Sequence, residues 1–222
     1  MTVEKSPYLV EDALVVLPDA KLTVNPGTVI WFRSLGMVIK GELQILGTRE
    51  DPVHLASLGS TNWKGIFIEH SRAENKLANC RISGAEFGFR ASDSKVSIEN
   101  CLFQNNIWGI VIEKGSAAID ASLVRTSAKS GLAAREARLV VKDSVITENN
   151  SGGILLKDSH VQIENNNILN NGGWGIKALA GPIQVEAANN WWGNEHPDTN
   201  QIIGPVQIQP VLKKPIDLNI LG

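Results

Sequence analysis

The chain has 222 residues, of which 43% are hydrophobic and 20% are charged, and its formal net charge is −2. These values are typical of a globular protein, and the charge gives no electrostatic reason to expect nucleic acid or an anionic membrane as a partner. The two cysteines are too few for a disulfide framework and lack the spacing of a zinc site. No apolar run approaches the roughly 18 residues of a membrane-spanning helix. We therefore expect one domain without a membrane span, a nucleic-acid partner, a metal or a cofactor.

A glycine followed by an apolar residue recurs along the chain at a nearly constant spacing. Successive steps are 23, 21, 22, 22 and 22 residues, and the glycines are Gly65, Gly88, Gly109, Gly131, Gly153 and Gly175. A second marker keeps the same period, at Asn79, Asn100, Ala121, Asp143, Asn165 and Ala187. Within each unit, apolar and polar residues alternate, as in GIVIEK, which is typical of short β-strands. The sequence therefore predicts a repeat protein whose units each contain about three strands.

Units of this length cannot bury an apolar face on their own, so neighbouring copies must stack with their strands in parallel. A propeller blade needs about 40 residues, and a leucine-rich repeat of this length carries an L-x-x-L-x-L signature that is missing here. We therefore predict an all-β fold, a single parallel β-helix of 22-residue coils. The predicted domain spans residues 1–222, with N-terminal coils at 1–62, regular coils at 63–188, and a closing coil and cap at 189–222.

Two segments outside the regular coils resemble a known family. Residues 22–57, which read LTVNPGTVIWFRSLGMVIKGELQILGTREDPVHLAS, are similar to the first coils of exported right-handed parallel β-helix proteins. This is the pectate lyase-like group, which includes the carbohydrate-binding and sugar-hydrolase repeat domain. The string NNWWG at 189–193 resembles the closing coil of the same proteins. The resemblance implies a right-handed solenoid, and it implies lyase, hydrolase or binding functions alike.

Alternate residues of a strand point to opposite faces, which divides each strand into inward and outward positions. The first and third residues after each glycine form apolar columns and are predicted to fill the core. The second residue faces outward, and this column consists of Phe67, Arg90, Val111, Ala133, Leu155 and Lys177. Apolar columns on an exposed sheet are of the kind found at contact sites. We predict that Phe67, Val111, Ala133 and Leu155 contact a protein partner or a second copy of the chain.

A second outward column also has an apolar centre, and it is predicted to contain Arg81, Leu102, Leu123, Val145, Asn167 and Asn189. Either the C-terminal tail of the chain or a partner is expected to cover one of the two columns.

Few residues suggest catalysis. The alignment places Glu69 with His70, Arg90 with Asp93, and Glu113 with Lys114 at equivalent positions on three successive coils. Two coils correspond to roughly 10 Å, near the carboxylate separation of inverting glycosidases. Glu69, Arg90 and Glu113 are therefore the candidate catalytic residues of a carbohydrate-active enzyme. Charges that alternate on an exposed sheet are usually cross-strand pairs, however, and no cluster of carboxylates for calcium is visible, so we favour a protein with no catalytic residues.

Aromatic residues give the only indication of a ligand. Trp108 and Trp174 precede their glycines at equivalent positions, with Phe87 in the same column, and we predict that the two tryptophans contact a glycan. Trp191 and Trp192 are interpreted as part of a lid over the last coil, because the end of a solenoid exposes apolar surface and unpaired strand edges.

The residues at the second marker are predicted to stack as an asparagine ladder at a turn. Cys80 and Cys101 directly follow two of these residues and are predicted to be stacked thiols in the core. A disulfide between their neighbouring coils is the alternative, and it would have to pull the strands inward.

The sequence therefore predicts a non-catalytic β-helix module that binds another protein or a glycan through an outward sheet face. The alternative is a polysaccharide lyase or glycosidase of the pectate lyase-like type. Residues 1–10 lack the basic start and apolar stretch of a signal peptide. The protein is expected in the periplasm or outside the cell if a leader has been removed, and in the cytosol otherwise.

Overall fold

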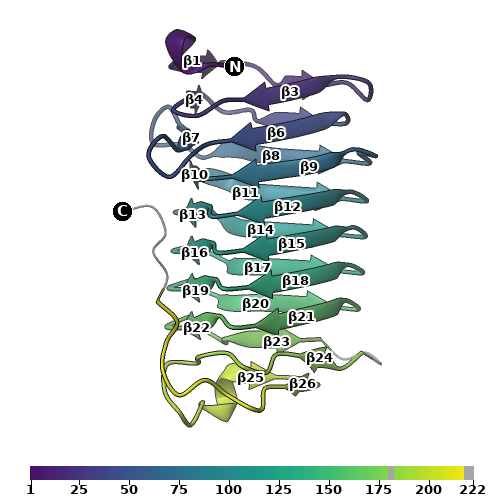
Figure 1. Ribbon diagram of the computed structural model, residues 1–222, viewed down its shortest axis with the longest axis vertical. Helices are drawn as coiled ribbons and strands as arrows, with labels where there is room; N and C mark the ends of the chain where they lie inside the picture. The colour runs from purple at the N-terminus through teal and green to yellow at the C-terminus, as the bar shows by residue number, and fades with distance from the viewer. Residues whose placement is uncertain (180–182, 218–222) are drawn as a thin grey trace.

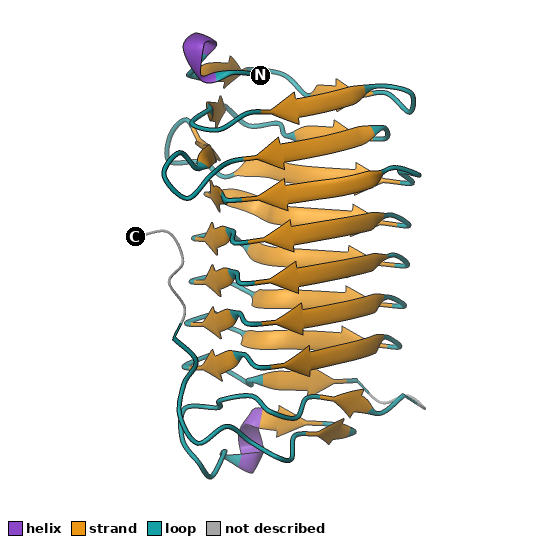
Figure 2. Cartoon of the chain, in the orientation of Figure 1, coloured by secondary structure: helices purple, strands orange, loops and turns teal. Residues whose placement is uncertain are grey.

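The computed structural model describes residues 1–179 and 183–217, and it is a parallel β-solenoid. Each coil contributes one strand to each of three sheets, which run the length of the molecule (Figure 1). Helix is confined, in the described residues, to two short 3-10 turns at Val3–Lys5 and Thr199–Gln201 (Figure 2). The predicted all-β solenoid is therefore confirmed. Residues 218–222 of the predicted cap lie outside the described residues.

The three sheets contain eight, nine and nine strands in the described part of the chain. Sheet A consists of β1 (Tyr8–Val10), β4 (Val29–Phe32), β7 (Val53–Ser57), β10 (Cys80–Ser83), β13 (Leu102–Gln104), β16 (Leu123–Arg125), β19 (Val145–Thr147) and β22 (Asn167–Leu169). Sheet B consists of β2 (Leu14–Val16), β5 (Met37–Ile39), β8 (Trp63–Glu69), β11 (Ala85–Ser92), β14 (Trp108–Glu113), β17 (Ser130–Arg135), β20 (Gly152–Lys157), β23 (Ile176–Ala178) and β25 (Ile202–Ile203). Sheet C consists of β3 (Lys21–Val24), β6 (Glu42–Leu46), β9 (Glu74–Ala78), β12 (Lys95–Glu99), β15 (Ser116–Asp120), β18 (Arg138–Lys142), β21 (His160–Glu164), β24 (Val185–Glu186) and β26 (Val206–Gln207).

The two inward columns of sheet B are buried, as the sequence predicts. Each residue pairs with its equivalent on the next coil, and the columns are Ile66, Phe89, Ile110, Leu132, Ile154, Ile176 and Ile68, Ala91, Ile112, Ala134, Leu156, Ala178. Stacked apolar side chains of this kind remove the inner faces of all three sheets from water, which is the main driving force for folding such a chain.

The 23-residue step between the first two repeats is a β-bulge. Phe87 pairs with Gly65, and Phe89 pairs with Ile66, so Gly88 is one extra residue on β11. Gly65 has a φ of +114°, and a Cβ built at this position would lie 1.7 Å from the carbonyl oxygen of Phe87. Only glycine fits there, because the next coil approaches too closely for a side chain.

The corner between sheets C and A is a column of residues with positive φ. Its members are Asn79, Asn100, Ala121, Asp143, Asn165 and Asn189. The side-chain amide of Asn100 donates to the side-chain oxygen of Asn79, and the side-chain amide of Asn165 donates to the carboxylate of Asp143. The predicted ladder therefore forms on both sides of Ala121 and is interrupted there. The prediction that Ala187 continues this column is wrong. The last step is two residues longer than the others, and Asn189 takes the position.

The C-terminal end of the solenoid is covered by its closing coil. Trp192 is only 8% exposed and belongs to the core, where its ring lies against Gly175. Trp191 pairs with Asn167, so the prediction that Asn189 follows Asn167 in the outward column is also wrong. The chain then runs back along sheet A, where Asn167 Nδ2 donates to the carbonyl of Ile216 at 3.0 Å and the Ile216 amide donates to Asn167 Oδ1 at 2.9 Å (Figure 1).

Candidate functional site

The outer face of sheet B carries a shallow groove of about 300 Å³ over β11, β14, β17 and β20. Its floor is the predicted outward column, in which Arg90, Val111, Ala133 and Leu155 follow one another on successive coils. Each of these side chains is partly exposed. The four residues of the predicted protein interface thus lie in one column, since Phe67 precedes Arg90, and their contact with a partner stays a prediction.

Two aromatic rings flank the floor of the groove. Phe87 and Trp108 pair across neighbouring strands, and their rings are parallel within 3° with centroids 6.4 Å apart. Phe67 meets the edge of Phe87 with centroids 5.7 Å apart. Each of the two stacked rings also makes a cation–π contact. The guanidinium of Arg90 lies 5.4 Å from the Phe87 ring centroid, and Lys129 Nζ lies 5.1 Å from the Trp108 ring centroid. The rings are therefore fixed in orientation and remain partly exposed.

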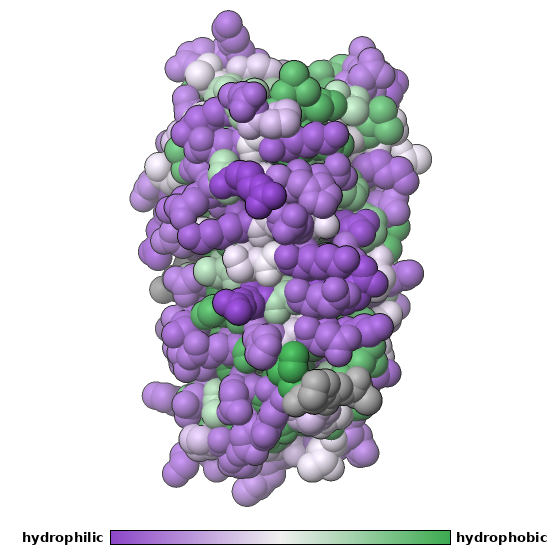
Figure 3. Space-filling view, turned by 90° about the vertical axis from the view of Figure 1, so that its right-hand side faces the viewer, coloured by the Kyte–Doolittle hydropathy of each residue, from purple (hydrophilic) through white to green (hydrophobic). Residues whose placement is uncertain are grey.

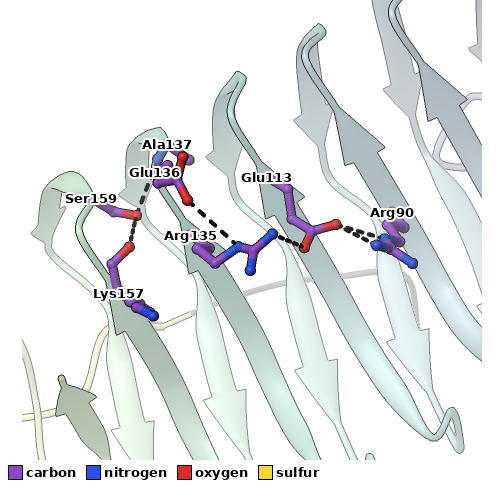
Figure 4. A network of polar contacts seen from close by, with 7 residues as sticks. All are labelled: Arg90, Glu113, Arg135, Glu136, Ala137, Lys157 and Ser159. Carbon is purple, nitrogen blue, oxygen red and sulfur yellow. Dashed lines mark hydrogen bonds and ion pairs between the residues drawn. The ribbon is translucent and has the colours of Figure 1, made fainter.

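A chain of ionic contacts forms the other border of the groove (Figure 4). Arg90 donates to Glu113 Oε2 from Nε at 2.8 Å and from Nη2 at 2.5 Å. Arg135 Nη2 lies 3.5 Å from the second oxygen of Glu113, and Arg135 Nε lies 3.9 Å from Glu136. The side chain of Glu113 is only 18% exposed, so two guanidinium groups hold this carboxylate against the sheet.

The predicted catalytic set is only partly brought together. Glu69 pairs with Ser92, and Ser92 pairs with Glu113, so Ser92 occupies the middle position that the sequence alignment gave to Arg90. That equivalence is wrong. Arg90 belongs to the neighbouring column and reaches Glu113 diagonally, because its side chain is long enough to cross between columns.

Glu69 lies in a separate hollow of about 270 Å³ together with Phe67, His70 and Arg90. No hydrogen bond or ion pair connects Glu69 with Arg90 or Glu113 in the part of the chain that the structure describes. The neighbouring His70 pairs with Asp93, with Nδ1 and Oδ2 3.2 Å apart on the exposed corner. The three candidate residues are thus an ion pair and a carboxylate that lines a different hollow.

The two tryptophans predicted to contact a glycan differ in position. Trp108 borders the groove, whereas Trp174 lies three coils further along and is not among the residues that line it. The Trp174 ring packs so closely on Gly152 that a Cβ there would lie 2.3 Å from it, and Lys177 Nζ lies 4.8 Å from the ring centroid. Trp174 therefore fills the space left by a glycine, and its contact with a glycan stays a prediction.

The sequence reasoning missed Arg135 and Lys129. Arg135 follows Glu113 in the same outward column on the next coil, so the repeat already placed it within reach, whereas Lys129 approaches the Trp108 ring from outside the predicted columns. Unlike the groove, the corner between sheets B and C is mostly hydrophilic (Figure 3). The residues with positive φ at this corner include His70, Asp93 and Lys114.

A larger hollow of about 570 Å³ lies on the outer face of sheet C. It is lined by small side chains such as Ser97, Ser116 and Ala118 and by charged residues such as Lys95 and Arg138. Its lining includes no phenylalanine, tryptophan or tyrosine, so it offers less aromatic surface than the sheet B groove for the orientation of a ligand.

Comparison with known proteins identifies the class of fold. Residues 56–192, more than half of the chain, match the family described as the right-handed β-helix region. The chain therefore belongs to the right-handed β-helix family, and the predicted handedness is confirmed. No curated protein matches its sequence.

Two solved structures are similar. The crystal structure of the periplasmic alginate epimerase AlgG is 12% identical, with 96% of this chain and 81% of that chain covered and a TM-score of 0.49. The crystal structure of the pectate lyase Pel9A is 14% identical, with 92% and 79% covered and a TM-score of 0.39. Neither similarity bears on what this chain binds.

Two further findings concern the described residues as a whole. They include no group of three or more histidine, cysteine or carboxylate side chains arranged to hold a metal ion. They also include no helix that is long and apolar enough to cross a membrane.

Proposed function

We propose that the protein binds an acidic polysaccharide, without cleaving it, in the groove on the outer face of sheet B. The observation that carries this proposal is the fixed pair of parallel, partly exposed rings of Phe87 and Trp108 beside a border of cationic side chains. Ligand sites combine apolar and aromatic surface with a few well-placed polar groups, and the apolar faces of sugar rings stack on aromatic side chains.

The charge of the groove favours an acidic chain. Cations around it include Arg90, Arg135, Lys157 and Lys129, whereas the lining contains a single carboxylate, that of Glu113. This carboxylate is already bound by two arginines, so the remaining cations are free to meet the acidic groups of a ligand. The protein as a whole carries a net charge of −2, so the groove is more basic than the rest of the surface.

The same charges argue against a large protein interface on this face. The apolar positions Phe67, Val111, Ala133 and Leu155 are interrupted by Arg90 and followed by Lys177. Interface centres are usually depleted of charged residues. The face suits a narrow, charged chain better than a wide apolar partner. Because acidic polysaccharides belong to cell surfaces and walls, the proposal implies a periplasmic or extracellular location.

The arrangement of the carboxylates supports binding without cleavage. Both oxygens of Glu113 are occupied by guanidinium groups, and Glu69 lies in a different hollow. A general acid and a base must both reach the scissile bond of one substrate. Glu113 is engaged by two arginines and Glu69 lines another hollow, which favours binding over cleavage.

Affinity electrophoresis in gels that contain polygalacturonate, alginate or neutral dextran tests the proposal. We expect the acidic polymers to retard the protein and dextran to leave it unchanged. Trp108→Ala should weaken the affinity for the acidic polymers about tenfold, which is a loss of about 1.4 kcal/mol in binding free energy. The control is Trp31→Ala, since Trp31 is 40% exposed on sheet A and lies away from the groove. The proposal fails if no acidic polymer retards the protein, or if both variants lose binding equally.

A second experiment distinguishes binding from catalysis. Incubation of the protein with the same polymers should leave their size distribution in gel filtration unchanged. Depolymerisation that disappears in Glu113→Gln would establish the enzyme alternative instead.

A further inference from the structure

Cys80 and Cys101 lie on successive coils, at the corner where sheet C passes into sheet A. The pairing of Arg81 with Leu102 sets the two cysteines in register, and their Sγ atoms are 3.3 Å apart. Both side chains are completely buried, and both thiols are free. The predicted stacked pair of core thiols therefore exists, at a distance close to van der Waals contact.

The following coils use this column differently. Its next members are Ser122, Ser144, Asn166 and Asn190, and each accepts a hydrogen bond from the backbone N–H of the preceding coil at 3.1, 3.1, 2.9 and 2.9 Å. A thiol is a weak acceptor, so cysteine is a poor substitute in this position. Cys80 and Cys101 occupy the two coils before this run, after Val53, and the side-chain contact between their coils is the one between the two sulfur atoms.

We propose that Cys80 and Cys101 form a disulfide between the two coils when the protein folds in an oxidising environment. Neighbouring strands are about 4.8 Å apart, within the Cα separation of about 4.4–6.8 Å that a disulfide spans. The sulfur atoms, now 3.3 Å apart, need to approach by about 1.3 Å to reach the bond length of about 2.05 Å. The link fastens the coil of β10 to the coil of β13 inside the core. It does not depend on the polysaccharide proposal.

The oxidant in this step is a small-molecule disulfide such as oxidised glutathione. The thiolate of one cysteine attacks it, forms a mixed disulfide and releases one glutathione thiolate. The second cysteine then displaces the other glutathione, so that two cysteine S–H bonds and one glutathione S–S bond are replaced by one protein S–S bond and two glutathione thiols. The hydrogen bond with Cys101 and the burial of the side chain raise the pKa of the Cys80 thiol. The folded protein therefore reacts slowly, and the disulfide forms during folding.

Refolding tests this proposal. The reduced, unfolded protein is refolded with oxidised glutathione, quenched in acid, unfolded again and treated with N-ethylmaleimide before its intact mass is measured. We expect no maleimide adduct and a loss of two hydrogen atoms. Trypsin should release one linked pair of peptides, residues 77–81 with residues 96–114, since these contain the two cysteines.

Cys80→Ser is the matched control and should carry one adduct or one bound glutathione on Cys101. Two maleimide adducts on the refolded wild-type protein would overturn the proposal, as would disulfides between molecules. A linked protein without the circular dichroism of the native β-sheets would also overturn it, because the bond would then belong to a misfolded state.

Discussion

The outer faces of sheets A and B are built alike and are used differently. Each carries an apolar column, with Leu123 and Val145 at the centre of the first and Val111 and Leu155 in the second. On sheet A the chain's own C-terminal segment returns, and Asn167 exchanges two hydrogen bonds with the backbone of Ile216. On sheet B the described residues form a groove bordered by aromatic rings and cations instead.

The difference shows that an apolar outward column does not by itself indicate a partner. A solenoid needs such residues wherever its own chain folds back, because covering them contributes about 25 cal/mol per Å² of buried apolar surface. What distinguishes sheet B is the chemistry beside the column. A returning segment of the same chain requires neither the oriented rings of Phe87 and Trp108 nor the ion pairs of Glu113.

The largest effect on the free energy of unfolding should come from comparing an inward with an outward residue on one strand, β14. Ile110 is completely buried, whereas its neighbour Val111 points into the groove. Ile110→Asp should prevent folding, because an unpaired charge in the dry core costs several kcal/mol. Val111→Asp should cost less than about 1 kcal/mol. Urea unfolding followed by circular dichroism measures both, and similar losses would contradict the assigned faces.

The next effect concerns the anchor of the C-terminal segment. Asn167→Ala removes both hydrogen bonds to Ile216 and leaves two partly buried backbone groups without them. We expect a loss of about 1–3 kcal/mol in the free energy of unfolding and faster proteolysis of the C-terminal segment. Asn150→Ala is the control, since Asn150 is exposed and lies outside the positive-φ columns. An Asn167→Ala protein as stable as the wild type would show that this contact does not hold the segment.

The two columns can also be compared directly with one substitution on each face. Val145 lies beside Asn167 on sheet A, and Leu155 occupies the groove on sheet B, and both are partly exposed. Val145→Glu should destabilise the protein by about 1 kcal/mol more than Leu155→Glu, because the first charge is placed next to the returning segment. Urea midpoints of the two variants test this difference. A greater loss for Leu155→Glu would mean that sheet B, and not sheet A, is the covered face.

The repeat made most of the fold predictable, and its exceptions made the site difficult. The inward positions of sheet B in the regular coils followed from the glycine period, because a strand alternates its side chains and each coil repeats the last. The register failed in the longer closing coil, where Asn189 takes the corner position, whereas the bulge at Gly88 left the predicted pairing of Ile66 with Phe89 intact. A local insertion shifts every later residue to the opposite face unless the loop absorbs it, and sequence spacing cannot show which occurs.

The contacts of the groove were less accessible to prediction for a second reason. Arg90 and Arg135 both reach Glu113, one diagonally from a neighbouring column and the other from the next coil. Long side chains select such partners only once the strands are in place. The path of the C-terminal segment depends in the same way on the contact between Asn167 and Ile216, which are 49 residues apart in sequence.

Sheet C supplies a third outer face for the comparison, and its charges should give the smallest effect. Burial raises the pKa of Asp120, with smaller contributions from the negative charges of Asp143 and Glu99. A carboxyl group whose pKa is higher in the folded than in the unfolded protein destabilises the fold while it is ionised, and this cost disappears below the unfolded pKa of about 3.9. Asp120→Asn should therefore raise stability at neutral pH by less than about 0.5 kcal/mol, since Asp120 is exposed to solvent, and should change nothing in acid.

Glu164→Gln should act in the opposite direction. A hydrogen bond from Lys142 lowers the pKa of Glu164, so the stability that its carboxylate contributes is present at neutral pH and lost in acid. Urea midpoints of both variants at neutral and acidic pH measure these signs, and a loss of stability in Asp120→Asn at neutral pH would show that this carboxylate is favourably placed.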